Sequence, residues 1–82
     1  PVTVYDYFVI RSKLNGRAVN VRGARAEHGT QLITWPAHAG DDQLWRYDDK
    51  KARIRSKLDD QLCISIDDGG YEIPHLSFFE IR

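Results

Sequence analysis

Histidine and cysteine side chains are the strongest candidates for metal chemistry in this chain of 82 residues. Zinc sites take their ligands from these residue types, in pairs that lie a few positions apart. The three histidines, His28, His38 and His75, and the single cysteine, Cys63, are all separated by ten or more positions. The spacing therefore predicts neither a metal site nor a bound cofactor.

Serine is another residue type that could act as a nucleophile. Ser12 and Ser56 both lie within the pentamer Ile-Arg-Ser-Lys-Leu, which occurs at Ile10–Leu14 and again at Ile54–Leu58. A serine that recurs with its whole neighbourhood is expected to serve structure rather than catalysis. No pattern typical of a Ser/His/Asp triad, a pair of catalytic carboxylates or a phosphate-binding glycine loop accompanies it. We therefore predict that the protein is not an enzyme.

The duplicated pentamer indicates an internal repeat, and its flanking residues support this interpretation. Each copy lies at the end of an alternating apolar strand. Each continues into a polar turn, Asn15-Gly16 or Asp59-Asp60, and then into a second alternating strand. Alternation with a period of two is typical of half-buried strands, and Asn-Gly favours a tight hairpin. The repeating unit is therefore rich in β-hairpins.

Short strands separated by turns rich in glycine and aspartate run along the whole chain. This pattern is typical of an all-β barrel or sandwich. One helical turn fits at Arg22–Glu27, where Gly23 and Gly29 leave little room for more. The predicted strands are Tyr5–Arg11, Ala18–Arg22, Gln31–Trp35, Leu44–Tyr47, Ala52–Arg55, Leu62–Ile66, Glu72–Leu76 and Phe78–Ile81.

Length and charge limit the classes of function. The chain has room for a single domain, 1–82, with two predicted units at about 5–48 and 49–82. Twelve basic and twelve acidic side chains balance, and the basic ones are scattered singly along the strands. Residues 1–40 carry five basic and two acidic side chains, and residues 41–82 carry seven and ten. Because no basic patch forms, we predict that nucleic acid is not a partner.

The cysteine count and the hydropathy bear on the compartment. The single cysteine, Cys63, excludes an internal disulfide, which fits a reducing compartment. No apolar run is long enough to cross a bilayer, and the first residues carry no apolar segment typical of a signal peptide. These observations predict a cytoplasmic protein that does not insert into membranes.

The order of motifs resembles the ricin B-type lectin repeat. That repeat runs through a strand and turn, an "LDV"-like strand, a glycine-containing loop, an apolar strand ending in Trp-Pro, and a Gln-x-Trp motif. Here the strand at 18–21 precedes Trp35-Pro36 and then Gln43-Leu44-Trp45. The second unit matches this order at its front, and after Ile66 neither Trp-Pro nor Gln-x-Trp returns.

The resemblance implies a β-trefoil, in which three such units supply twelve strands to a barrel and its cap. The two units of this chain supply about eight strands. Either a neighbouring copy completes the barrel, or the sequence is part of a longer protein. Open strand edges and an apolar interior facing water are costly. We therefore expect a homo-oligomer, a dimer or a trimer, whose barrel is closed with the stretch Asp67–Arg82.

The resemblance also implies a shallow sugar pocket in each unit. An aromatic ring covers the apolar face of a sugar, and an aspartate bonds neighbouring hydroxyl groups. In the first unit Trp35 takes the place of the ring and Asp42 that of a further polar contact, but Gly23 stands where the aspartate is expected. In the second unit Asp68 stands at that position, without the tryptophan. The predicted carbohydrate-binding residues are Trp35, His38, Asp42 and Asp68.

Core and register are predicted as well. Gln43 and Trp45 are expected to be buried, with the indole filling the interior and the amide satisfying backbone groups of a turn. Leu14 and Leu58 of the duplicated pentamer are predicted core residues. At the end of the chain two alternatives stay open. Either Phe79 replaces the core tryptophan in the second unit, or the last residues pair with the first strand and open a third unit.

Two functions of different kinds remain open. The first is a carbohydrate-binding module of the ricin B type, with galactose-type sugars among the ligands that the resemblance implies. The second is an assembly module that keeps the fold without binding sugar. Gly23 in place of the aspartate favours the second, whereas Trp35-Pro36 and Asp68 favour the first. We predict the carbohydrate-binding function.

Overall fold

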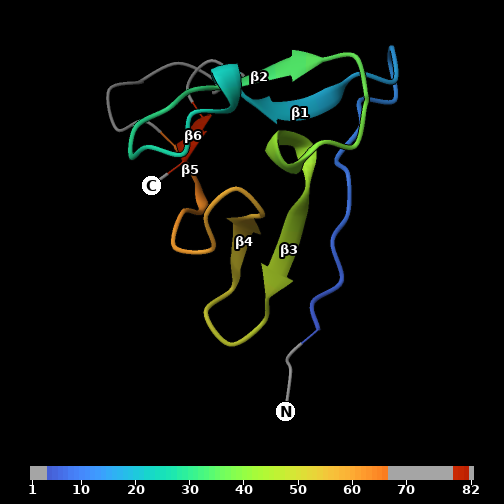
Figure 1. Cartoon of the computed structure of the whole chain (residues 1–82). Helices are drawn as coiled ribbons and strands as arrows, with labels where there is room; N and C mark the ends of the chain where they lie inside the picture. Colours follow the sequence, from blue (N-terminus) through green and yellow to red (C-terminus); the bar gives the residue numbers. More distant parts are fainter. Residues whose placement is uncertain (1–3, 67–78, 82) are drawn as a thin grey trace.

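The computed structural model describes residues 4–66 and 79–81, which form a β-rich fold (Figure 1). In these residues the only helical segments are two 3-10 turns, one of them inside the stretch predicted to hold a helical turn. The all-β prediction is therefore confirmed. The elements are β1 (Ala18–Val21), η1 (Arg22–Ala24), β2 (Leu32–Trp35), η2 (Asp41–Gln43), β3 (Trp45–Asp48), β4 (Arg53–Ser56), β5 (Ile64–Ile66) and β6 (Phe79–Ile81).

Within the described residues the strands pair as three antiparallel two-stranded sheets, β1–β2, β3–β4 and β5–β6. All six strands lie within the predicted stretches or one residue beyond them. The predicted strand at Tyr5–Arg11 instead makes two isolated bridges, from Phe8 to β3 and from Arg11 to β1. The predicted strand at Glu72–Leu76 lies outside the described residues. The opening segment thus joins two sheets without forming a regular strand of its own.

One small hydrophobic core joins the three sheets. Its buried residues are Val21, Leu32, Trp45, Leu62 and Ile81. Val21 and Leu32 lie opposite each other across β1 and β2, so a single cross-strand pair fills one side of the core. Trp45 has no exposed surface, and its indole Nε1–H donates a hydrogen bond to the carbonyl oxygen of Val19 at 3.3 Å. The predicted burial of Trp45 is confirmed.

The two leucines of the duplicated pentamer differ in burial. Leu58 is half-buried and packs against the core, in partial agreement with its prediction. Leu14 has 92% of its surface exposed, so its prediction as a core residue is wrong. The physical reason is its place at the tip of the first turn, which projects beyond the bridge that ties Arg11 to β1.

The two serines of the pentamer make the same local hydrogen bond. Ser12 Oγ accepts a hydrogen bond from the Leu14 amide, and Ser56 Oγ accepts one from the Leu58 amide, both at 3.1 Å. Such short-range side-chain bonds to the backbone define a turn. The predicted structural role of both serines is therefore confirmed.

Strand β6 pairs with β5. It runs antiparallel to β5, with Ile64 opposite Ile81 and Ile66 opposite Phe79. β5 follows the second pentamer as β1 follows the first, and among the described residues β6 pairs with β5 as β2 pairs with β1. The two predicted alternatives for the end of the chain stay predictions. The division into units at about 5–48 and 49–82 stays a prediction.

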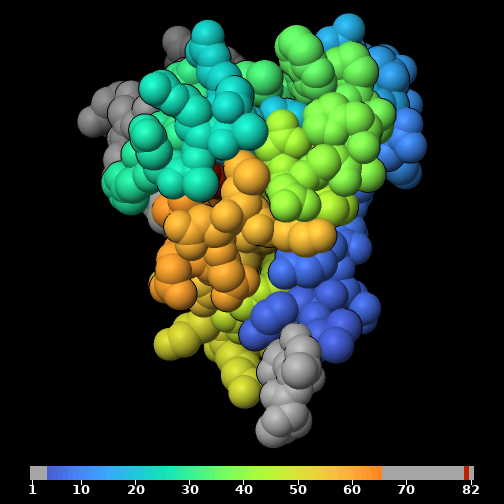
Figure 2. Space-filling model, viewed as in Figure 1, coloured from blue at the N-terminus to red at the C-terminus, as the bar shows by residue number. Residues whose placement is uncertain are grey.

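Two segments far apart in the sequence share one face of the molecule. The loop that contains His28 and the segment around Gln61 lie side by side and border one hollow (Figure 2). The same loop also bonds to β6: the Gly29 amide donates to the Ile81 carbonyl at 2.8 Å, and the Ile81 amide donates to the Thr30 carbonyl at 3.0 Å. The loop after β1 therefore connects the sheet β1–β2 to the sheet β5–β6 through backbone hydrogen bonds.

Candidate functional site

A shallow pocket of about 220 Å³ lies where β1, η1, β2 and η2 meet. It is lined by Asn20, Gly23, Ala24, Ile33, Trp35 and Asp42. The structure thus brings two of the four predicted site residues, Trp35 and Asp42, into one pocket together with Gly23. His38 is not among the lining residues, and Asp68 lies outside the described residues.

Trp35 is the last residue of β2 and has 53% of its surface exposed. The next residue is a proline, which lacks the amide hydrogen that would continue the strand. At the other end of β2, Leu32 is buried in the core opposite Val21. The sheet therefore anchors the backbone while the indole stays open to a flat apolar surface, such as the C–H face of a sugar ring.

Gln43 holds the walls of the pocket together. Its Nε2 donates hydrogen bonds to Asn20 Oδ1 at 2.9 Å and to the Pro36 carbonyl at 3.0 Å. Its Oε1 accepts hydrogen bonds from the amides of His38 at 2.8 Å and Ala39 at 3.2 Å. The side chain is fully buried, so these bonds form away from competing water. The prediction that this amide satisfies backbone groups is confirmed.

His38 lies beside Asp42, outside the pocket. Its Nδ1 accepts a hydrogen bond from the Gly40 amide at 2.9 Å, so a neutral ring carries its proton on Nε2. Nε2 lies 3.7 Å from Asp42 Oδ1, which is too far for a hydrogen bond. A Cβ atom at Gly40 would lie 2.7 Å from the histidine ring and 2.9 Å from the same Asp42 oxygen, so a side chain there would displace one of these groups.

Asn20 is a pocket residue that the sequence analysis missed. It lies in β1 and has only 4% of its surface exposed. Its Nδ2 donates a hydrogen bond to the Val21 carbonyl at 2.8 Å, while Oδ1 accepts the bond from Gln43. A buried polar side chain needs such partners and is uncommon in an apolar strand. The asparagine inside Ala-Val-Asn-Val was therefore the signal that could have identified it.

Gly23 lies at the edge of the pocket, at the position where a sugar-binding aspartate was expected. Its φ of +63° is in the left-handed region, which aspartate and asparagine tolerate better than other residues with a side chain. A Cβ atom here would lie 3.6 Å from Arg25 Cγ, which is an ordinary contact distance. The backbone could thus accommodate a short carboxylate, but the pocket has none on this side.

Two ion pairs strengthen the sheet β3–β4 and the turn that follows it. Arg46 makes two hydrogen bonds to Asp60, from Nε at 2.6 Å and from an NH2 group at 2.7 Å. Arg55 Nε donates to Asp48 Oδ2 at 2.9 Å. The hydrogen bond from Arg46 holds the pKa of Asp60 below its ordinary value, and the bond from Arg55 does the same for the pKa of Asp48. These residues do not line the pocket at Trp35. The pairs join β3 to β4 and to the turn at Asp60.

The described residues contain neither a metal-binding cluster nor a membrane-spanning helix. Among residues 4–66 and 79–81, no group of three or more histidine, cysteine, aspartate or glutamate side chains is placed to hold a metal ion. The part of the chain that the structure describes also contains no helix with the length and apolar character needed to span a bilayer.

Comparison with known proteins identifies one family. The sequence model of the family described as ricin-type beta-trefoil lectin domain-like matches residues 2–72, which is most of the chain. Searches of curated proteins and of solved structures found no match. The matched stretch contains every residue that lines the pocket, as well as Gln43 and Trp45.

Proposed function

The chain belongs to the ricin-type β-trefoil lectin domain-like family, and we propose that it binds carbohydrate, without catalysis, in the pocket at Trp35. The resemblance noted in the sequence is thereby confirmed at the level of the family. One observation carries the proposal: a half-exposed indole and a carboxylate, Trp35 and Asp42, line the same shallow pocket. This pairing supplies both an apolar platform and a charged hydrogen-bond acceptor.

Each side chain has a distinct part in the proposed binding. The indole of Trp35 covers the C–H face of a pyranose ring and loses little conformational freedom in doing so. The Asp42 carboxylate accepts charge-assisted hydrogen bonds from sugar hydroxyl groups. With glycine at position 23, the second carboxylate is absent from this pocket. We therefore expect weak affinity for a single sugar, on the order of 1 mM.

A glycan array followed by calorimetry tests this function. The array includes galactose-terminated glycans, since these are the ligands that the resemblance implies, and the best soluble monovalent binder is then titrated in solution. Trp35→Ala is expected to abolish binding while leaving the melting temperature unchanged, because the side chain is exposed.

Tyr47→Ala is the matched control, because Tyr47 is an equally exposed aromatic residue that does not line the pocket. In the titration with the monovalent sugar, where association of chains does not raise the affinity, this variant is expected to bind like the unmodified chain. Failure of the chain to bind any glycan in both assays would contradict the carbohydrate function and favour the assembly module. Equal loss of binding by both variants in this titration would show that the pocket at Trp35 is not the site.

We also propose that copies of the chain associate. Support comes from exposed aromatic residues on the opening segment and on β3: Tyr5, Tyr7, Phe8 and Tyr47. Tyr5 and Tyr47 line one common hollow together with the charged residues Arg46, Asp48, Asp49 and Lys50, and exposed aromatic rings of this kind are typical of an interaction surface. Association would also raise weak sugar affinity through multivalency.

Sedimentation equilibrium at micromolar concentration tests association. We expect a dimer or a trimer, and we expect weaker association when Tyr5 and Tyr47 are both replaced by serine. Replacement of Leu14, which is exposed on the first turn, serves as the control and should leave association unchanged. A stable species of 9.5 kDa at all concentrations would contradict the proposal.

A further inference from the structure

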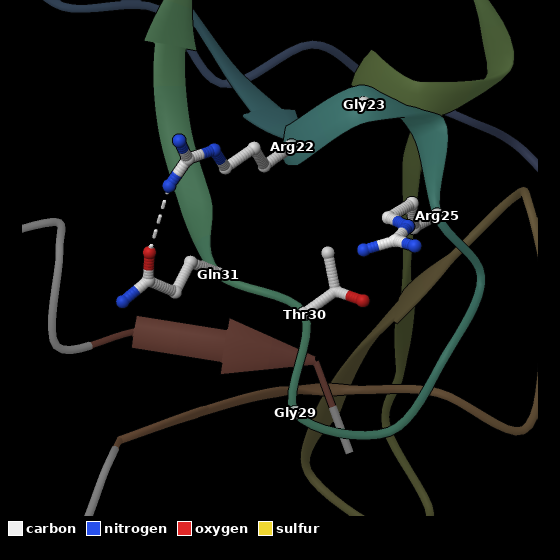
Figure 3. Close-up of a pocket in the computed structure, with 6 residues that line it drawn as sticks. All are labelled: Arg22, Gly23, Arg25, Gly29, Thr30 and Gln31. Carbon is white, nitrogen blue, oxygen red and sulfur yellow. Dashed lines mark hydrogen bonds between the residues drawn. The ribbon is translucent and has the colours of Figure 1, made fainter.

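A second hollow, of about 480 Å³, adjoins the pocket at Trp35. It is lined by Arg22, Gly23, Arg25, Gly29, Thr30 and Gln31. In Figure 3 the Arg25 guanidinium is directed toward Thr30, whereas Arg22 turns toward Gln31 and donates a hydrogen bond to its Oε1 at 3.3 Å. Gly23 lines both spaces, so the second hollow begins where the first pocket ends.

The second hollow carries positive charge from two arginines. The partner of Arg22 is a neutral amide, and the ion pairs among the side chains that the structure describes, those of residues 4–65 and Ile81, include neither Arg22 nor Arg25. Glu27, the acidic residue of the same loop, does not line the hollow. Guanidinium groups present a planar fork of donors that matches the oxygens of a carboxylate or a sulfate. The lining therefore suits a bound oxyanion.

We propose that this hollow binds an oxyanion, a sulfate ester or a carboxylate, carried by the same glycan whose sugar ring stacks on Trp35. The inference rests on the proposed carbohydrate function and names the class of glycan that the site takes. The sugar ring lies in the smaller pocket, and its acidic substituent, or that of the adjoining sugar, reaches past position 23 to Arg25.

The glycine at position 23 supports this assignment. An aspartate there would place a carboxylate between the two spaces, with its Cβ 3.6 Å from Arg25 Cγ. That carboxylate would pair with the guanidinium and would repel an acidic ligand. Glycine removes the competing charge and leaves an open passage. The residue that weakens the binding of a neutral sugar is therefore the one that permits an acidic glycan.

One glycan core in three forms tests the inference: neutral, sulfated and carboxylated. Calorimetry with the full chain at low salt is expected to show roughly fivefold tighter binding of at least one acidic form than of the neutral form. Raising the salt from about 0.05 M to about 0.5 M should shrink this advantage, because exposed charges are screened. Comparison of the two acidic forms identifies which oxyanion the hollow prefers.

Arg25→Gln removes the charge and keeps most of the side-chain length. We expect this variant to bind the acidic and neutral forms equally, with unchanged affinity for the neutral form. Arg17→Gln is the matched control, since Arg17 is an exposed arginine of the first turn that lines neither space. It should keep the full preference. A preference that persists in Arg25→Gln would overturn the inference.

Gly23→Asp tests the same idea in the opposite direction. The left-handed φ at this position is accessible to aspartate, so the variant is expected to fold. Its carboxylate should strengthen binding of the neutral glycan and remove the advantage of the acidic forms. An unchanged preference for the acidic glycan in this variant would overturn the inference.

The outcomes separate this inference from the function on which it rests. Neutral glycan binding that depends on Trp35, with no gain from an oxyanion, would leave the carbohydrate function standing and overturn only the inference. Binding of the acidic glycan that is undiminished in Trp35→Ala would also overturn the inference, because the pocket at Trp35 and the second hollow would then bind their ligands independently. Absence of all glycan binding would overturn both.

Discussion

The two copies of Ile-Arg-Ser-Lys-Leu form the same turn at different depths in the molecule. In each copy the serine hydroxyl accepts a hydrogen bond from the amide of the leucine two residues later. Yet Ser56 is completely buried and Leu58 half-buried, whereas Leu14 is almost fully exposed. Five identical residues therefore encode one local conformation and two different environments.

The neighbours of each turn explain the difference. In the first copy, the side chain of Arg11 donates a hydrogen bond to the Gly16 carbonyl, which belongs to the same turn. Arg55 in the second copy instead reaches Asp48 on β3 and the carbonyl of Asp60. The second copy thus lies between strand β3 and the turn at Asp60, whereas the first copy lies at the edge of the molecule. Local sequence determines the turn, and the strands on either side determine its burial.

Replacing Trp45 should have the largest effect on stability, because this residue contacts the segment before the first pentamer as well as the second pentamer. Its backbone exchanges two hydrogen bonds with Phe8, just before the first copy, and lies opposite Ser56 of the second. Trp45→Ala is expected to lower the free energy of unfolding by about 3–5 kcal/mol, measured by chemical denaturation. Trp35→Ala, which removes the exposed tryptophan, is the control. Near-normal stability of Trp45→Ala would refute its place in the core.

The next largest difference is expected between the two leucines of the pentamer, whose replacement should cost unequal amounts of stability. Leu58→Ala removes a half-buried side chain that packs on the core and should lower the free energy of unfolding by about 1–2 kcal/mol. Leu14→Ala should change it by less than about 0.5 kcal/mol, because the side chain is exposed. Denaturation of both variants under one set of conditions measures the contrast. Equal losses would mean that a partner covers the first turn in solution.

The serines test the same contrast with a hydrogen bond. Ser56→Ala leaves the Leu58 amide without its acceptor in a buried place, so it should cost about 1–2 kcal/mol. After Ser12→Ala, water can replace the hydroxyl, and the expected cost is about 0.5 kcal/mol. Thermal melts of the two single variants measure the two losses of stability. A larger loss for Ser12→Ala than for Ser56→Ala would contradict the deeper burial of the second copy.

Local patterns were sufficient to predict most of the fold. The alternation of apolar residues located all six strands, and the Gln-x-Trp motif identified Trp45 and Gln43 as buried. The burial of Leu14 and the pairing of β6 were not predictable from the same patterns. Both depend on which strands lie beside a segment, and a pentamer or a short apolar run carries no information about its neighbours.

The candidate site was predictable in part for the same reason. Trp35 and Asp42 have fixed places relative to Trp-Pro and Gln-x-Trp, so motif order was enough to identify them. Asn20 and Arg25 belong to no such motif. Asn20 lies in the pocket at Trp35, where Gln43 orients it. Arg25 lines the adjoining hollow, because the left-handed turn at Gly23 brings its side chain alongside. Their roles follow from three-dimensional contacts.

Acid should affect the two copies unequally, and this is the smallest expected effect because both ion pairs keep some contact with water, with 46% of the Asp60 side chain and 16% of the Asp48 side chain exposed. The pKa of Asp48, hydrogen-bonded to Arg55, and the pKa of Asp60, hydrogen-bonded to Arg46, are lowered from 3.8. A carboxyl whose pKa is lower in the folded state stabilises the fold above its unfolded pKa. That contribution is lost as the pH falls below 3.8 through the folded pKa.

Melting temperatures between about pH 7 and about pH 2.5 measure this effect. The unmodified chain should lose stability below about pH 4. The double variant Asp48→Asn with Asp60→Asn should be less stable at neutral pH and lose less on acidification, because it has no such protons to bind. Arg11→Gln is the matched control in the first copy. Its guanidinium bonds a neutral carbonyl, so the acid sensitivity of this variant should equal that of the unmodified chain. If Arg11→Gln instead reduced acid sensitivity as much as the double variant does, the ion pairs of the second copy would not be its source.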